Sequence, residues 1–95
     1  MADGWVWTMR LWRRLGACHE AKEDHREAFL AYQAGLRTLF GLADGDPHAE
    51  SREATYETRA CFAGVSRCAY ELGEFEMAID MGAGAVDMDR HYERV

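Results

Sequence analysis

Apolar residues recur at intervals of three and four along most of this 95-residue chain, which is the period of an amphipathic α-helix. A first helix is predicted from about Trp5 to Ala21. Its expected apolar stripe consists of Trp5, Leu11, Trp12, Leu15 and Cys18. The three tryptophans cannot all face one seam, so we expect Trp12 in the core. Trp5 or Trp7 either covers the end of the core or meets a partner.

A second helix is predicted between Asp24 and about Phe40. Asp24 is a favourable N-cap, and Glu27 follows it at the spacing of a capping box. Gly41 is expected to end this helix, and residues 42–46 are expected to form a loop.

A third helix is predicted from Pro47, in its first turn, to Leu72, with Gly73 ending it. Its first half, up to Arg59, contains few apolar residues, so we expect that half to be solvated and the second half to be packed. A fourth helix is predicted over 74–89, with residues 91–95 as a tail or the start of another helix. Its expected buried face contains Ala78, Ile79, Gly82, Ala85 and Val86, and its glycines favour close helix packing.

Composition agrees with a single all-α domain spanning residues 1–95, because 48% of residues are hydrophobic and the chain has a single proline. The net charge of −6 argues against nucleic acid as a partner. Arginines interrupt every apolar run, so no membrane span is expected. The three cysteines form no C-x-x-C motif, which favours free thiols in a reducing compartment, cytoplasmic or also nuclear.

No sequence motif indicates catalysis, a metal or a cofactor. His19 and Glu20 resemble the start of a zinc-protease motif, but the next histidine, His25, lies too far along to share a helix face with His19. A phosphate-binding glycine loop is absent as well, since Gly82 and Gly84 fall inside a predicted helix. We therefore expect a protein that is not an enzyme.

The chain contains an internal repeat with a constant offset of 50 residues. The first copy has a large aromatic residue, an aliphatic residue, a small residue, an alanine and a second aromatic residue. These are Trp12, Leu15, Gly16, Ala28 and Tyr32. The corresponding residues of the second copy are Phe62, Val65, Ser66, Ala78 and Gly82.

The first copy resembles the tetratricopeptide repeat, whose pattern is W-x2-L-G-x2-Y followed by A-x3-F. The second copy is degenerate, because Ala69 and Gly82 replace aromatic residues of the family pattern, and the offset exceeds the family period of about 34 residues. The resemblance implies antiparallel helical hairpins, about 5–41 and about 47–90, stacked as a short right-handed solenoid. An ordinary four-helix bundle with small-residue seams is the alternative.

The resemblance also implies a protein-interaction module that binds a peptide or helix of another protein in a concave groove lined by the first helix of each hairpin. The groove residues carried over from the family are Arg10, Arg13, Ala17, Glu20, Ala63, Arg67, Tyr70 and Glu71. Arg13 and Arg67 are expected to pair with carboxylates, either on a partner or on glutamates of this chain. The asparagine-containing clamp of some family members is not expected, since the chain has no asparagine.

Two other functions remain open. Repeat arrays usually need about three repeats for stability, so the chain either pairs with a copy of itself or precedes further repeats beyond its C-terminus. A small helical-bundle enzyme is the third and least supported alternative.

Overall fold

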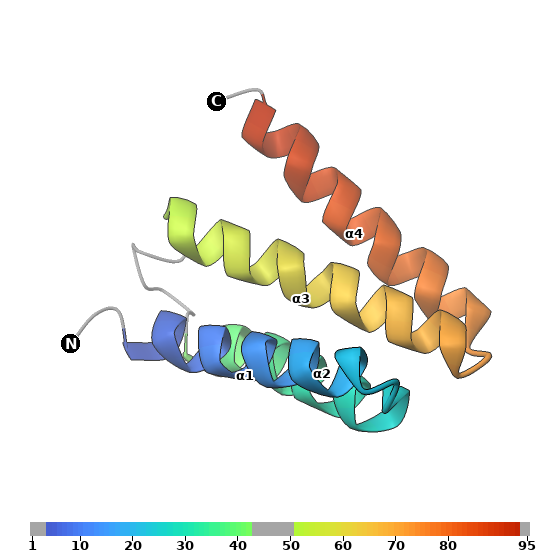
Figure 1. Cartoon of the computed structure of the whole chain (residues 1–95). Helices are drawn as coiled ribbons and strands as arrows, with labels where there is room; N and C mark the ends of the chain where they lie inside the picture. The colour runs from blue at the N-terminus through green and yellow to red at the C-terminus, as the bar shows by residue number, and fades with distance from the viewer. Residues whose placement is uncertain (1–3, 43–50, 94–95) are drawn as a thin grey trace.

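The structure is a computed structural model that describes residues 4–42 and 51–93. Within these residues it consists of four α-helices and contains no strand (Figure 1). The helices are α1 (Gly4–Ala21), α2 (His25–Leu42), α3 (Arg52–Glu71) and α4 (Phe75–Glu93). The predicted all-α class is confirmed.

Both helical hairpins close with the same tight turn, and the two turns lie 50 residues apart. In the first turn the amide of Asp24 donates to the carbonyl of His19 at 2.9 Å, and in the second the amide of Glu74 donates to the carbonyl of Ala69 at 2.8 Å. The residue before each donor has a positive φ, 60° at Glu23 and 82° at Gly73. The repeat offset seen in the sequence is therefore present in the backbone.

The start of α3 differs from the prediction. Ser51 has extended backbone angles, and its hydroxyl accepts a hydrogen bond from the amide of Ala54 at 3.2 Å. Ser51 is thus the N-cap, and the helix begins at Arg52 instead of continuing through from Pro47. Pro47 and nearly all of the predicted loop 42–46 lie outside the described residues, apart from Leu42, which ends α2.

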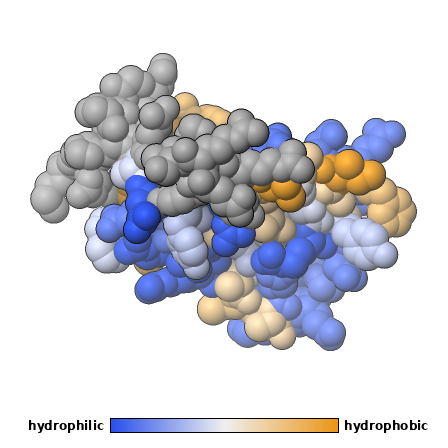
Figure 2. All heavy atoms as spheres, turned by 90° about the horizontal axis from the view of Figure 1, so that it is seen from above, coloured by the Kyte–Doolittle hydropathy of each residue, from blue (hydrophilic) through white to orange (hydrophobic). Residues whose placement is uncertain are grey.

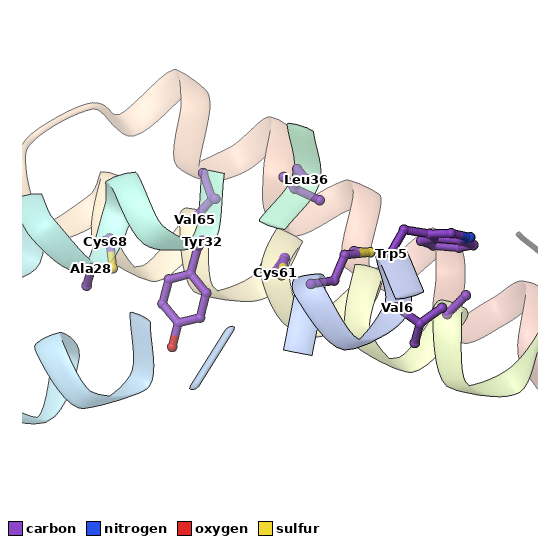
Figure 3. Packing of buried hydrophobic residues seen from close by; sticks show 10 residues of the cluster. Trp5, Val6, Ala28, Tyr32, Leu36, Cys61, Val65 and Cys68 are labelled. Carbon is purple, nitrogen blue, oxygen red and sulfur yellow. The ribbon is translucent and has the colours of Figure 1, made fainter. Parts of the chain in front are cut away.

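The core lies where α3 packs against α1 and α2, while α4 packs mainly against α3 (Figure 1). Its buried residues come from the first three helices. They are Trp5, Val6, Met9, Ala28, Tyr32, Leu36, Ala54, Cys61, Val65 and Cys68 (Figure 3).

Trp5 of the predicted apolar stripe of α1 is buried as expected, but the direction of the rest of the stripe is wrong. The helix buries Trp5, Val6, Met9 and Gly16, whereas Leu11, Trp12, Leu15 and Cys18 are exposed. On a helical wheel the buried face is rotated by about 100° from the predicted stripe. The reason is that Arg13 and Glu20 point toward α3 and form ion pairs there, so polar residues occupy part of the packed face.

The first half of α3 is packed, contrary to the expectation of a solvated segment. Ala54, Glu57 and Thr58 are all buried, and the Glu57 side chain is 1% exposed. The hydroxyl of Thr58 donates to the carbonyl of Ala54, and the carboxylate of Glu57 receives two arginines from α1. Polar residues are buried here because each finds a partner.

Small residues bring α3 and α4 close together, as the glycine positions predicted. A Cβ atom added at Gly82 would lie 3.1 Å from the hydroxyl oxygen of Ser66, and that hydroxyl donates to the carbonyl of Ala78. The predicted buried face of α4 is only partly correct, because Ile79 and Val86 are exposed. They lie beyond the narrow strip that contacts α3.

Candidate functional site

The ring of Tyr32 is held between two glycines on different helices. A Cβ atom added at Gly16 of α1 would lie 2.9 Å from this ring, and one added at Gly64 of α3 would lie 2.6 Å from it. Figure 3 shows the ring pointing from α2 toward α1. Gly16 and Tyr32 are predicted repeat positions, but Gly64 was missed because the repeat aligns Ser66 with Gly16.

The hydroxyl of Tyr32 takes part in a hydrogen-bond network that joins α1, α2 and α3. It donates to Oε1 of Glu20 at 2.9 Å. Arg67 of α3 donates two hydrogen bonds to the same carboxylate, from Nε to Oε2 at 2.8 Å and from Nη2 to Oε1 at 3.0 Å. The side-by-side geometry is the strong, bidentate form of an arginine–carboxylate contact.

The network shifts the pKa values of its members. The pKa of Glu20 is lowered chiefly by the hydrogen bond from Arg67, with a smaller contribution from the Tyr32 hydroxyl. Burial, followed by the bond to Glu20, raises the pKa of Tyr32 to about 12. The bond to Glu20 also raises the pKa of Arg67. At neutral pH the site therefore holds a carboxylate, a neutral phenol and a guanidinium.

A second ion-pair cluster lies further along the same interface, around Glu57. Arg10 Nε donates to Oε1 of Glu57 at 2.9 Å, and Arg13 Nε donates to Oε2. The hydrogen bond to Glu57 raises the pKa of Arg13. The guanidinium of Arg10 lies 4.6 Å from the centroid of the Trp7 ring. One buried carboxylate of α3 thus binds two arginines of α1, and one of these arginines also lies over the Trp7 ring.

Two hollows open beside these networks, and Glu20 and Arg67 line both. The smaller, of about 250 Å³, is named the arginine hollow. Its lining comes from α1, α2 and α3, and consists of Arg13, Ala17, Glu20, Tyr32, Arg59, Ala60, Ala63 and Arg67. The larger, of about 670 Å³, is named the apolar hollow. It is lined by Glu20, His25, Ser66, Arg67, Tyr70, Glu71, Phe75, Ala78 and Ile79.

The structure brings most of the predicted groove residues together. Arg13, Ala17, Glu20, Ala63 and Arg67 line the arginine hollow. Tyr70 and Glu71 line the apolar hollow instead, whereas Arg10 lines neither and contacts Glu57. Both arginines that were expected to pair with carboxylates do so within the chain, with Glu57 and Glu20.

Sequence reasoning missed two contributions to these surfaces. Arg59 lies in the polar half of α3 that was expected to be solvated, yet it lines the arginine hollow. Phe75, which was not among the expected apolar-face residues, and Ile79, which was expected to be buried, lie four residues apart on α4, line the apolar hollow and are exposed. Their helical spacing is the signal that could have identified an apolar face at this end of α4.

Charge is distributed unevenly over this part of the chain. Four arginines, Arg10, Arg13, Arg59 and Arg67, gather around the arginine hollow and the adjoining Glu57 cluster, and three of them pair with Glu20 or Glu57. The chain as a whole has a net charge of −6. Arginine is therefore concentrated along the α1–α3 surface of an acidic protein.

Two of the three cysteines are poorly suited to nucleophilic chemistry. Burial raises the pKa of Cys61 to about 12 and that of Cys68 to about 11, whereas a reactive thiol needs a lowered pKa.

Within residues 4–42 and 51–93, no three His, Cys, Asp or Glu side chains are arranged to hold a metal ion. No helix in that part of the chain combines the length and apolarity needed to cross a membrane.

Comparisons of the chain with protein-family models, with curated proteins and with solved structures find no match. The geometry and the charged groups of the two hollows are therefore the features that bear on function.

Proposed function

We propose that this protein is an interaction module, not an enzyme, and that it binds an acidic segment of another protein along the α1–α3 surface. The observation that carries the proposal is the arginine hollow. Residues of the first helix of each hairpin, far apart in the sequence, line one concavity that is rich in arginine. Arginine is the residue best suited to binding carboxylates in a defined geometry.

The proposed architecture is a tetratricopeptide-like pair of hairpins in a short right-handed solenoid. Three features support it: the repeated turn, the glycines that flank Tyr32, and the packing of α3 against both helices of the first hairpin. In such an array each hairpin buries its apolar face against the next one. The inner helices then form a continuous surface for a partner.

Arg67 has capacity for a ligand in spite of its ion pair. Its bonds to Glu20 and Tyr32 use Nε and Nη2, and its side chain is 56% exposed. A guanidinium has five N–H donors, and the two on Nη1 make no hydrogen bond within the described residues. A carboxylate of the partner would bind the guanidinium from that side, in competition with Glu20.

A peptide selection tests this proposal directly. A phage library of random linear 12-residue peptides is selected on the immobilised chain, and the selected peptides are then measured by fluorescence polarisation against variants. Ala17→Glu places a negative charge in the arginine hollow, and we expect it to weaken binding by at least about tenfold. Ala83→Glu is the matched control, because Ala83 is exposed on α4 and lines neither hollow.

The expected result is a selection enriched in Asp and Glu, with binding that Ala17→Glu weakens and Ala83→Glu leaves unchanged. A selection that yields no binding peptide overturns the proposal. Peptides without acidic residues, or equal effects of the two variants, overturn it as well.

Self-association is the second candidate function, and one observation favours it. Trp7, Leu11 and Leu15 are exposed at intervals of four along α1, so they form an apolar ridge on the side away from the core. Such a ridge is a common means of helix pairing. Light scattering separates the two functions, because a monomer over a wide concentration range removes the dimer. The three free thiols support placing the module in a reducing compartment such as the cytoplasm.

A further inference from the structure

The apolar hollow differs in chemistry from the arginine hollow beside it. Three large apolar side chains line it, and all three are mostly exposed: Tyr70 is 62% exposed, Phe75 57% and Ile79 71%. The rings of Tyr70 and Phe75 meet edge to face, with centroids 5.5 Å apart. Isolated exposed apolar residues are ordinary, but three around one hollow form a patch that an apolar group can cover. Hydrophobic residues lie exposed among hydrophilic ones toward the end of the molecule where the hairpin turns lie (Figure 2).

The charges at the rim decide which group fits there. The apolar hollow is bordered by the carboxylates of Glu20 and Glu71 and by the guanidinium of Arg67, so it has no surplus of positive charge. An acidic side chain would be repelled by Glu71 and would lose hydration against the aromatic rings. A bulky uncharged side chain would instead cover the rings and leave the rim in water.

The two hollows are neighbours, since Glu20 and Arg67 form part of the wall of both. A single extended segment advances about 3.3–3.6 Å per residue, so residues close together in its sequence can enter both hollows. The arginine-rich hollow selects a carboxylate, and the aromatic hollow selects an apolar side chain.

We propose that the apolar hollow binds a bulky aliphatic or aromatic side chain of the partner, located within a few residues of the acidic residue that binds the arginine hollow. This inference rests on the proposed function and deepens it, because it specifies the chemistry of the partner segment. The recognition element is a short acidic and apolar motif. Ile79 and Phe75 of α4 contact the apolar residue of this motif.

The test extends the same peptide selection with one pair of variants on α4. Ile79→Asp removes the apolar contact and adds a negative charge to the hollow. Val86→Asp is the matched control, because Val86 is exposed on the same helix and lines neither hollow. For a selected peptide we expect Ile79→Asp to weaken binding by at least about tenfold, the loss expected for one buried aliphatic contact, and Val86→Asp to change it less than about twofold. Circular dichroism checks that both variants keep their helices.

The outcomes separate this inference from the proposed function. Selected peptides with both acidic and bulky apolar residues, whose affinity falls with Ile79→Asp, support both. Acidic peptides without an apolar preference, or equal effects of Ile79→Asp and Val86→Asp, overturn the inference and leave the proposed function standing. Apolar peptides that respond to Ile79→Asp but not to Ala17→Glu overturn the proposed function. Failure to select any peptide overturns both.

Discussion

Substituting Gly64 with alanine tests whether Tyr32 is confined between α1 and α3. The added Cβ atom would lie 2.6 Å from three carbon atoms of the Tyr32 ring, whereas unstrained carbon–carbon contacts are about 3.5–4.0 Å. The ring has little room to move away, because Gly16 borders it from α1 and its hydroxyl is bonded to Glu20. Either α3 shifts as a whole or the tyrosine leaves its hydrogen bond.

The magnitude follows from two opposing effects. Forcing an extra methyl group into a packed interface costs about 1–3 kcal/mol, and the severe overlap at Gly64 points to the upper end of that range. Replacing glycine by alanine inside a helix stabilises it by about 1 kcal/mol. We therefore expect Gly64→Ala to lower the free energy of unfolding by about 2 kcal/mol.

Urea unfolding followed by circular dichroism measures this free energy. Gly84→Ala is the matched control, because a Cβ atom there would lie 3.5 Å from the Phe62 ring, which is an ordinary contact. We expect that variant to be more stable than the wild type by about 0.5–1 kcal/mol. Combining Gly64→Ala with Tyr32→Leu removes the clash, so the double variant should lose less stability than the sum of the single variants.

The sign of the change in unfolding free energy decides whether Tyr32 is confined in this way. If Gly64→Ala stabilises the protein as Gly84→Ala does, the overlap with Tyr32 does not exist, and α3 does not approach α1 and α2 through this glycine. If the effects of Gly64→Ala and Tyr32→Leu are simply additive, the two residues are not in contact.

Three other measurements examine the pH dependence, the thiols and the turns. The pKa of Glu20 is held below its ordinary value of 4.5 in the folded chain, so its stabilising contribution is present above that value and is lost as the pH falls through the folded pKa. Glu20→Gln should therefore lower the urea midpoint at neutral pH and leave it near that of the wild type at about pH 2, and a difference independent of pH would contradict this. A thiol reagent at about pH 8 should modify exposed Cys18 quickly and Cys61 only on unfolding, because burial raises the pKa of Cys61 to about 12; fast modification of both would show that the core is open. Because both turns have a residue with positive φ, Glu23→Gly should raise the unfolding free energy by about 0.5–1 kcal/mol and Gly73→Ala should lower it by about 1 kcal/mol; shifts of the same sign would contradict the equivalence of the turns.

The helices and turns were predictable because their signals are local. Apolar spacing gave four helices, and Gly73 marked the end of α3. The start of α3 was predicted wrongly because Ser51 and Pro47 are both acceptable at a helix start, and a local pattern does not choose between them. Local periodicity also failed to find the packed face of α1, since Arg13 and Glu20 take up part of it.

Only those residues of the candidate site that the repeat alignment could place were predicted from the sequence. Repeat positions placed Arg13 and Arg67 at one surface, and both line the arginine hollow. Glu57 was missed because its partners lie more than 40 residues away in the sequence, and a glutamate in a polar segment has no local mark of burial. The burial of such a residue depends on which helices meet, which periodicity alone does not specify.

In the arginine hollow, the carboxylate of Glu20 competes with an acidic partner for Arg67. Arg67 is already bound to Glu20 when an acidic partner arrives. The binding free energy gained is therefore only the difference between the partner's contact with Arg67 and that of Glu20. Ion pairs on largely exposed arginines are worth about 0–1 kcal/mol, and Arg67 is 56% exposed, so exchanging one carboxylate for another is inexpensive. Glu20 would not be left unpaired after the exchange, because the Tyr32 hydroxyl still donates to it. The charge contacts therefore supply selectivity for acidic segments and a dependence on salt, while most of the affinity has to come from apolar contacts beside them.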